Sequence, residues 1–250
     1  MYNINFQYHA LEEGAPEENN LGRIKALLDK QSQSNKSVIS CIGETGLDYS
    51  EGFPNKEHQI PWFKAQLELA FEYELPIFLH ERLAFEDTLQ CIDEVSEKHS
   101  GKQVPKIIVH CYTGSFDECV EYMKRGYYTS ISGYINKPDS GDEVKRCLRE
   151  GIIPMNKLMI ETDSPYMGFA GNKDSFFDAE GESFTNLSAK KRKRLKSLYP
   201  NLPSSLPLIL DAVCNEINIG LKEREETSLS RQELAQITTE NAISFFGLHP

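Results

Sequence analysis

Several features that define other classes of protein are missing from this sequence. No apolar stretch approaches the roughly 18 residues that a membrane-spanning helix needs, so we expect no membrane contact. The first residues, Met1 to His9, contain neither a basic segment nor a small-residue cleavage site, which argues against a secretory signal peptide. The six cysteines form no C-x-x-C pair and are expected to be buried, reduced thiols of a cytoplasmic protein.

Positive charge is also scarce. The chain has 27 basic and 38 acidic residues and a formal net charge of −11. This balance argues against a protein that coats nucleic acid by charge alone. An enzyme that binds a phosphodiester locally through metal ions is still compatible with this charge balance.

One segment departs from this acidic background. Residues Lys190 to Lys196 hold six of the 27 basic residues within seven positions. Three interpretations stay open: a solvated loop, a contact to a nucleic-acid backbone through residues such as Lys191 and Arg192, and a nuclear localisation signal. The predicted location is therefore cytoplasmic, with a nuclear alternative.

Strand-like apolar runs alternate with amphipathic, helix-like segments along most of the chain. Two helices are preceded by capping boxes, formed by Ser115 with Glu118 and by Ser230 with Glu233. Alternation of this kind predicts an α/β fold with a parallel sheet, as in a (β/α) barrel of the TIM type. The six predicted strands are Ile4–His9, Ser37–Glu44, Pro76–His80, Lys106–His110, Tyr127–Gly133 and Lys157–Asp163.

Four of these runs end on a side chain that can bind a metal ion: Glu44, His80, His110 and Asp163. The ends of parallel barrel strands meet on one face, so the four side chains are expected to converge there. Carboxylate and imidazole groups in this number are typical ligands of a divalent metal. The pattern therefore predicts a metal-dependent hydrolase.

The number of predicted strands is lower than a closed barrel requires. A barrel of this type has eight strands, whereas six are predicted here. Open edges favour self-association. We expect a single hydrolase domain over residues 1–250 that is incomplete, closes differently, or is covered by a partner. No obligate protein partner is evident from the sequence.

Four segments give a specific family resemblance. G-E-T-G-L-D-Y (Gly43–Tyr49), P-I-F-L-H-E-R (Pro76–Arg82), V-H-C-Y-T-G (Val109–Gly114) and E-T-D-S-P-Y (Glu161–Tyr166) occur in this order. They closely resemble the signature segments of the TatD family of metal-dependent deoxyribonucleases. The C-terminal N-A-I-S-F-F-G-L (Asn241–Leu248) is similar to the end of that family's sequences.

The resemblance implies a role for each matching residue. Glu44 corresponds to a glutamate that bridges two divalent ions, and His80 and His110 to the histidines on one of them. Asp163 corresponds to an aspartate that binds the other ion or orients the attacking water. The implied cofactors are one or two ions of Mg²⁺, Mn²⁺ or Zn²⁺ per chain. DNA is the implied substrate, and hydrolysis of its phosphodiester bonds is the implied activity.

The chain also departs from the family pattern. The family opens with an H-x-H motif that holds the second ion, and this sequence contains no H-x-H. The missing part corresponds to the first two β/α units, so reduced activity is expected from this chain alone. Two alternatives stay open: a non-catalytic, truncated relative, and an amidohydrolase acting on a small ester or amide.

Further residues are candidates for lesser roles. Arg82 follows a ligand candidate and is a candidate phosphate contact, and His9 lies in a segment that resembles a family turn. Together with Lys191 and Arg192 they form the predicted substrate-binding set. Asp48 is expected to hold the loop after Glu44 rather than take part in chemistry.

Overall fold

The structure is a computed structural model that describes residues 18–33, 38–138, 140–174, 185–195 and 197–248. The chain divides into two compact units. Residues Met1–His110 and Ala242–Pro250 make up unit 1, and Cys111–Asn241 make up unit 2. The expectation of one hydrolase domain over residues 1–250 stays a prediction.

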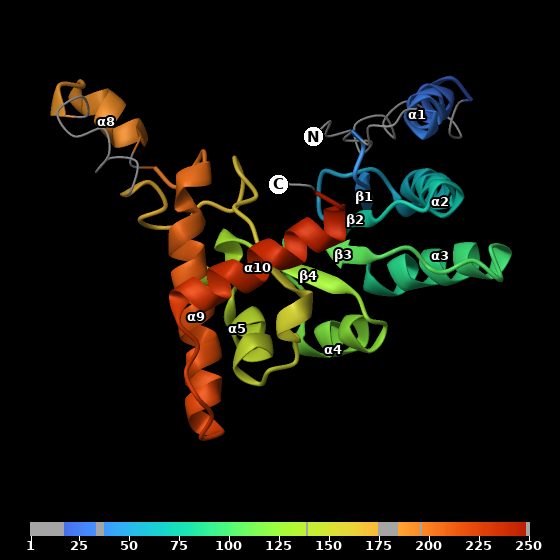
Figure 1. The fold of residues 1–250 in the computed structure, drawn as a ribbon. Helices are drawn as coiled ribbons and strands as arrows, with labels where there is room; N and C mark the ends of the chain where they lie inside the picture. The colour runs from blue at the N-terminus through green and yellow to red at the C-terminus, as the bar shows by residue number, and fades with distance from the viewer. Residues whose placement is uncertain (1–17, 34–37, 139, 175–184, 196, 249–250) are drawn as a thin grey trace. The chain divides into compact units, whose positions relative to one another are not determined.

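Unit 1 is built from parallel strands that alternate with helices (Figure 1). Strand β1 pairs with β2, and β2 pairs with β3, in both cases parallel. Helix α2 packs against β1 and against α3. The elements are α1 (Glu18–Ser32), β1 (Ile42–Asp48), α2 (Lys56–Tyr73), β2 (Ile77–Arg82), α3 (Phe85–Lys98) and β3 (Ile107–Val109).

Unit 2 continues the same alternation. Strands β4 and β5 are parallel, with Thr129 opposite Leu158, and helix α5 packs against α9. Helix α10 begins in unit 2, and its last residues belong to unit 1. The elements are α4 (Phe116–Lys124), β4 (Tyr128–Ile131), η2 (Gly133–Asn136), α5 (Asp142–Arg149), η3 (Met155–Lys157), β5 (Leu158–Ile160), α8 (Ala189–Leu195), η4 (Pro203–Ser205), α9 (Leu206–Glu223) and α10 (Arg231–Phe246).

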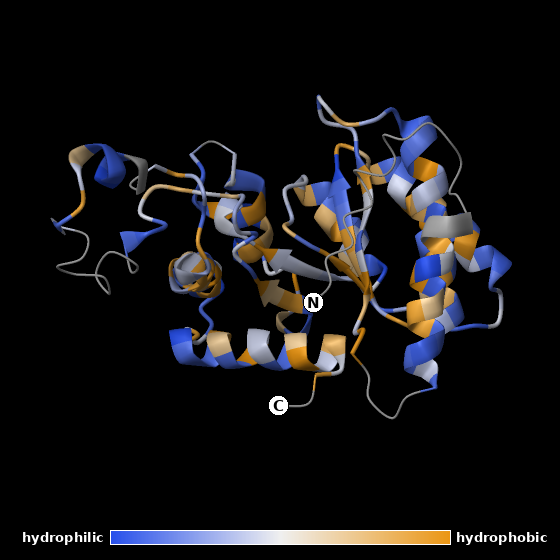
Figure 2. Ribbon diagram, turned by 90° about the horizontal axis from the view of Figure 1, so that it is seen from above, coloured by the Kyte–Doolittle hydropathy of each residue, from blue (hydrophilic) through white to orange (hydrophobic). Residues whose placement is uncertain are grey.

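The positions of apolar residues explain how strands and helices pack in unit 1. All three residues of β3 are apolar and only 1% exposed, as expected for a strand covered on both faces. On α2, Phe63, Leu67 and Phe71 are spaced one turn apart and are at most 1% exposed. Burial of each such side chain contributes about 1.5–3 kcal/mol. Figure 2 shows the helices banded in hydrophilic and hydrophobic colours, the pattern of an amphipathic helix.

Local signals in the sequence define two helix starts. The Ser115 hydroxyl accepts a hydrogen bond from the Glu118 amide (3.3 Å), and the Glu118 carboxylate accepts one from the Ser115 amide (2.6 Å). Ser230 and Glu233 make the same reciprocal pair, at 3.2 and 2.8 Å. Both predicted capping boxes are confirmed. No helix among the described residues is long and apolar enough to cross a membrane.

Five of the six predicted strands are confirmed, and the sixth, Ile4–His9, lies outside the described residues. All five of these predicted strand ends were wrong by one to four residues: β3 ends at Val109 rather than His110, and β4 at Ile131 rather than Gly133. Strand β1 continues past Glu44 to Asp48, β2 continues past His80 to Arg82, and β5 ends at Ile160, before Asp163.

Strands β1 and β2 stay paired beyond their apolar runs because glycine lets the two backbones meet. A Cβ atom on Gly46 would lie 1.7 Å from the carbonyl oxygen of His80, and Gly46 has a φ of +152°. Only glycine fits this position. The backbone ladder therefore continues to Asp48, opposite Arg82, although the side chains there are polar.

Candidate metal centre

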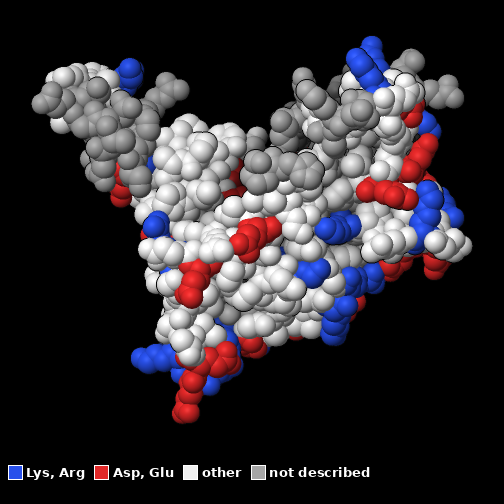
Figure 3. Space-filling view, in the orientation of Figure 1, with Lys and Arg blue, Asp and Glu red and all other residues white. Residues whose placement is uncertain are grey.

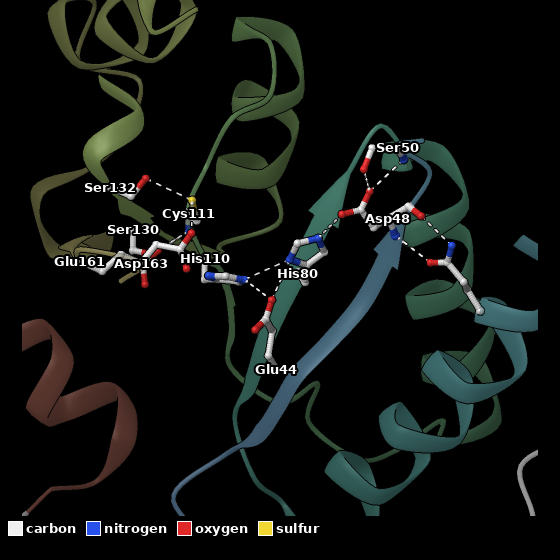
Figure 4. A network of polar contacts seen from close by, with 11 residues as sticks. Glu44, Asp48, Ser50, His80, His110, Cys111, Ser130, Ser132, Glu161 and Asp163 are labelled. Carbon is white, nitrogen blue, oxygen red and sulfur yellow. Dashed lines mark hydrogen bonds and ion pairs between the residues drawn. The ribbon is translucent and has the colours of Figure 1, made fainter. Parts of the chain in front are cut away.

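Three adjacent strands of unit 1 bring Glu44, His80 and His110 together. Glu44 lies in a bulge of β1. Gly43 is opposite Phe78 and Thr45 is opposite Leu79, so no residue of β2 lies opposite Glu44 in the strand register. Such a bulge re-aims the side chain of the extra residue. His80 lies within β2, and His110 directly follows β3. Figure 4 shows the three side chains pointing toward one another.

The three donor atoms form a small triangle. Oε1 of Glu44 is 2.8 Å from Nδ1 of His80 and 2.9 Å from Nε2 of His110. The two histidine nitrogens are 3.3 Å apart. Ligands at about 2.0–2.1 Å from a metal, separated by angles of about 90–110°, lie roughly 2.8–3.4 Å from one another. The triangle therefore has the size of one face of a coordination sphere.

Two histidines keep the Glu44 carboxylate in the ionised form that can bind a metal. Burial alone would raise the pKa of Glu44, but hydrogen bonds and charge from His110 and His80 outweigh it and hold that pKa well below its usual value. His110 is 6% exposed, and its ring stacks on Phe78 with centroids 4.6 Å apart. Glu44 therefore stays ionised at neutral pH beside two imidazoles, which is the donor set of a divalent metal site.

Asp48 contacts the site from the end of β1. Its Oδ2 atom is 3.0 Å from Nε2 of His80, on the side of the ring opposite Glu44. The sequence interpretation had given Asp48 only the task of holding a loop and missed this contact. The Asp in G-E-T-G-L-D-Y was visible, but its distance from His80 depends on the pairing of β1 with β2.

Asp163 belongs to unit 2 and follows β5 by three residues. It adopts a left-handed conformation with a φ of +52°. Its Oδ2 atom accepts a hydrogen bond from the Cys111 thiol at 3.5 Å. Burial, then the charges of Glu161 and Asp163, raise the pKa of Cys111 well above its usual value, so the thiol keeps the proton that it donates.

Glu161 organises the backbone next to Asp163 in the same unit. One of its oxygens accepts hydrogen bonds from the Cys111 amide at 2.5 Å and from the Ser130 hydroxyl at 2.8 Å. Ser132 contacts the Cys111 sulfur at 3.1 Å. Figure 4 labels this network. The sequence interpretation missed Glu161, and the available signal was its place two residues before Asp163.

The other predicted site residues lie in different settings. Arg82 ends β2, and its side chain is exposed. Lys191 is exposed and Arg192 is partly buried on α8 of unit 2. Residues Ala189–Leu195, which contain five of the six basic residues of the run, form the short helix α8, where a solvated loop was one of the interpretations. His9 lies outside the described residues.

Charge is mixed on one face of the protein (Figure 3). On the face shown in Figure 3, acidic and basic side chains are interspersed among the described residues. The concentration of lysine and arginine on α8 is therefore a local feature within a chain whose net charge is −11.

Comparisons with known proteins identify sequence relatives. A family model described as TatD related DNase matches residues 8–247. The "3'-5' ssDNA/RNA exonuclease TatD" of Salmonella typhimurium is 37% identical over 134 residues, which cover 54% of this chain and 49% of that protein. The protein of the same name from Citrobacter rodentium is 31% identical over 210 residues, covering 84% of this chain and 66% of that protein. The chain thus spans about half to two thirds of the length of these relatives.

Solved structures show the same fold. The TatD homologue YjjV from Escherichia coli K12 superimposes with a TM-score of 0.68 at 20% identity, covering 96% of this chain and 73% of that one. A TatD-family hydrolase from Entamoeba histolytica gives a TM-score of 0.66 at 24% identity, covering 96% of this chain and 70% of that one. The predicted TIM-barrel-like α/β class is confirmed by these neighbours.

Proposed function

Since this chain belongs to the family of TatD-related DNases, we propose that it is a divalent-metal-dependent hydrolase that cleaves DNA phosphodiester bonds. The observation that carries the proposal is the convergence of Glu44, His80 and His110, whose donor atoms all lie within 4.8 Å of one another. Their carboxylate and imidazole atoms suit Zn²⁺ or Mn²⁺, and Mg²⁺ is the third candidate.

The candidate residues are proposed to bind the metal ion, the attacking water or the phosphate. Nδ1 of His80, Nε2 of His110 and Oε1 of Glu44 supply the lone pairs that hold the ion. A divalent ion held by these residues would supply polarisation of a phosphoryl oxygen and a lower pKa of a bound water. Asp163 either orients the attacking water or binds a second ion. We propose that Arg82, at the exposed end of β2, contacts a phosphate.

The names of the relatives support a proposal for the substrate class. Those described above are named as exonucleases acting from 3' to 5' on single-stranded DNA and RNA. We therefore propose single-stranded DNA as the preferred substrate, with His9, Lys191 and Arg192 as further contacts to the backbone. We also propose a cytoplasmic location, with α8 as the alternative nuclear signal. Self-association through open sheet edges stays a prediction.

Removal of metal tests the proposed activity. Protein treated with a chelator is expected to degrade a 3'-labelled single-stranded oligonucleotide at least about 100-fold more slowly than the untreated protein, because water activation and charge neutralisation are lost. Adding back Mn²⁺, Zn²⁺ or Mg²⁺ separately should restore cleavage and identify the metal. A duplex of the same sequence, assayed in parallel, measures strand preference.

A Glu44→Ala variant is the control for contaminating nucleases. Degradation by this variant at the rate of the unmodified chain would assign the activity to a contaminant. If neither protein cleaves DNA with any of the three metals, the non-catalytic alternative replaces the nuclease proposal.

Helix α8 should contribute to substrate binding through charge. Changing Lys190, Lys191 and Lys193 to glutamine removes three exposed positive charges. If all three contact phosphates, the slope of log affinity against log salt should fall by about 2 for single-stranded DNA. Fluorescence anisotropy with a labelled oligonucleotide in the Glu44→Ala background measures the slope.

The matched control removes the same charge elsewhere on the surface. Lys56, Lys98 and Lys124 have side chains that are 53%, 63% and 69% exposed, and none lies on α8. Their joint change to glutamine should leave the slope nearly unaltered. Equal effects from the two triple variants would show that net charge, rather than α8, governs binding.

A further inference from the structure

The two ring nitrogens of His80 face different partners. Nδ1 points to the centre of the candidate metal site, 2.8 Å from Oε1 of Glu44 and 3.3 Å from Nε2 of His110. Nε2 points away from that centre and lies 3.0 Å from Oδ2 of Asp48. A neutral imidazole carries its proton on only one nitrogen, so the partner of Nε2 decides whether Nδ1 has a free lone pair.

Hydrogen bonds hold Asp48 in a position from which it can determine the tautomer of His80. Its side chain is only 3% exposed. The Ser50 amide donates to Oδ1 at 2.9 Å, and the Ser50 hydroxyl donates to the same oxygen. The Gln59 side chain accepts from the Asp48 amide at 2.8 Å and donates to the Asp48 carbonyl at 2.6 Å.

The two carboxylate oxygens of Asp48 have separate tasks. Oδ1 is used by Ser50 and holds the turn after β1, whereas Oδ2 is left facing His80. Holding the turn alone would not require the second oxygen to lie at hydrogen-bond distance from a ligand candidate. Carboxylates that accept a proton from the far nitrogen of a metal-binding histidine fix both its orientation and its tautomer.

We propose that Asp48 is a positioning residue that accepts the Nε2 proton of His80 and thereby presents Nδ1 to the metal ion. The proposal rests on the proposed function for the presence of a metal at Glu44, His80 and His110. It assigns His80 to the ion through Nδ1 and gives β1 two contributions to the site: Glu44 as a ligand, and Asp48 as the group that orients the neighbouring ligand.

Binding of Co²⁺ to the metal-free chain of 250 residues tests the proposal without an activity assay. The visible absorption of bound Co²⁺ reports its ligands, and competition with a chromophoric chelator gives the affinity. Asp48→Ala is expected to weaken Co²⁺ binding about 10- to 100-fold and to change the absorption spectrum, because His80 is no longer held. Asp48→Asn should be less affected, because its amide oxygen still accepts from Nε2.

Ser50→Ala is the matched control, because it removes a partner of Oδ1 and leaves the contact of Oδ2 with His80. It should bind Co²⁺ within about threefold of the unmodified chain, with the same spectrum. Thermal unfolding of each metal-free variant separates loss of orientation from loss of stability. If Ser50→Ala and Asp48→Ala lose affinity equally and in step with their melting temperatures, Asp48 acts only through the fold and the proposal is overturned.

Two further variants distinguish failure of this proposal from failure of the proposed function. If His80→Ala and Glu44→Ala weaken Co²⁺ binding but Asp48→Ala does not, only the positioning role is overturned. If none of these variants affects Co²⁺ binding, the metal site itself is wrong, and both proposals are overturned. A chain that binds Co²⁺ with the expected dependence on Asp48 but cleaves no DNA overturns the nuclease proposal alone.

Discussion

Replacing His80 with alanine is expected to weaken divalent-metal binding at least about 100-fold and to slow DNA hydrolysis about 1,000-fold. A set of four ligands binds zinc with roughly 10–16 kcal/mol, so the loss of one ligand costs about 3 kcal/mol. The three donor atoms here are 2.8 to 3.3 Å apart, so all three can contact one ion. Loss of the ion removes water activation and charge neutralisation together.

Isothermal titration with Zn²⁺ and Mn²⁺ measures the first effect, and cleavage of a labelled single strand measures the second. His58→Ala is the matched control, because His58 is an exposed residue in the first turn of α2. It should bind metal and cleave DNA like the unmodified chain. Equal metal affinities of the His80 and His58 variants would exclude His80 from the site.

The convergence of Glu44, His80 and His110 could be predicted from the sequence because it depends on one topological rule. Glu44, His80 and His110 each lie at or just beyond a short apolar run, and parallel strands bring such positions to the same edge of a sheet. The starts of two helices could also be predicted from the sequence, because a capping box is a local contact between residues three positions apart.

Contacts that depend on register could not be predicted. The apolar run of β1 stops near Glu44, yet pairing continues to Asp48 because Gly46 lets the backbone approach His80. That extension brings Asp48 within 3.0 Å of His80. The Glu161 network likewise joins Cys111 to β4 and β5 across about 50 residues, and no local pattern specifies it.

The basic run shows a different limit of sequence interpretation. Lys190–Lys196 has no apolar periodicity, so a solvated loop was one of its interpretations, but residues Ala189–Leu195 form α8. Lysine, arginine, leucine and alanine all have high intrinsic helix propensity. Propensity therefore decides the local structure where no apolar face exists to give a periodic signal.

Asp163→Asn is expected to slow DNA hydrolysis about 1,000-fold while leaving metal binding by Glu44, His80 and His110 intact. Removing a carboxylate that orients or deprotonates the attacking water costs about 10²- to 10⁴-fold. Asparagine is isosteric with aspartate and tolerates the left-handed conformation of this residue, with its φ of +52°, so the fold should be preserved. The three candidate metal ligands all belong to unit 1, whereas Asp163 belongs to unit 2.

The number of ions bound distinguishes the two roles open to Asp163. If Asp163 only orients water, its asparagine variant binds as many ions as the unmodified chain. If Asp163 holds a second ion, the variant binds one ion fewer, while the ion at the triad keeps its affinity. Asp174→Asn is the matched control, because Asp174 is an exposed carboxylate of the same unit. Hydrolysis by the Asp163 variant at the rate of the Asp174 variant would exclude both roles, because each requires the negative charge of that carboxylate.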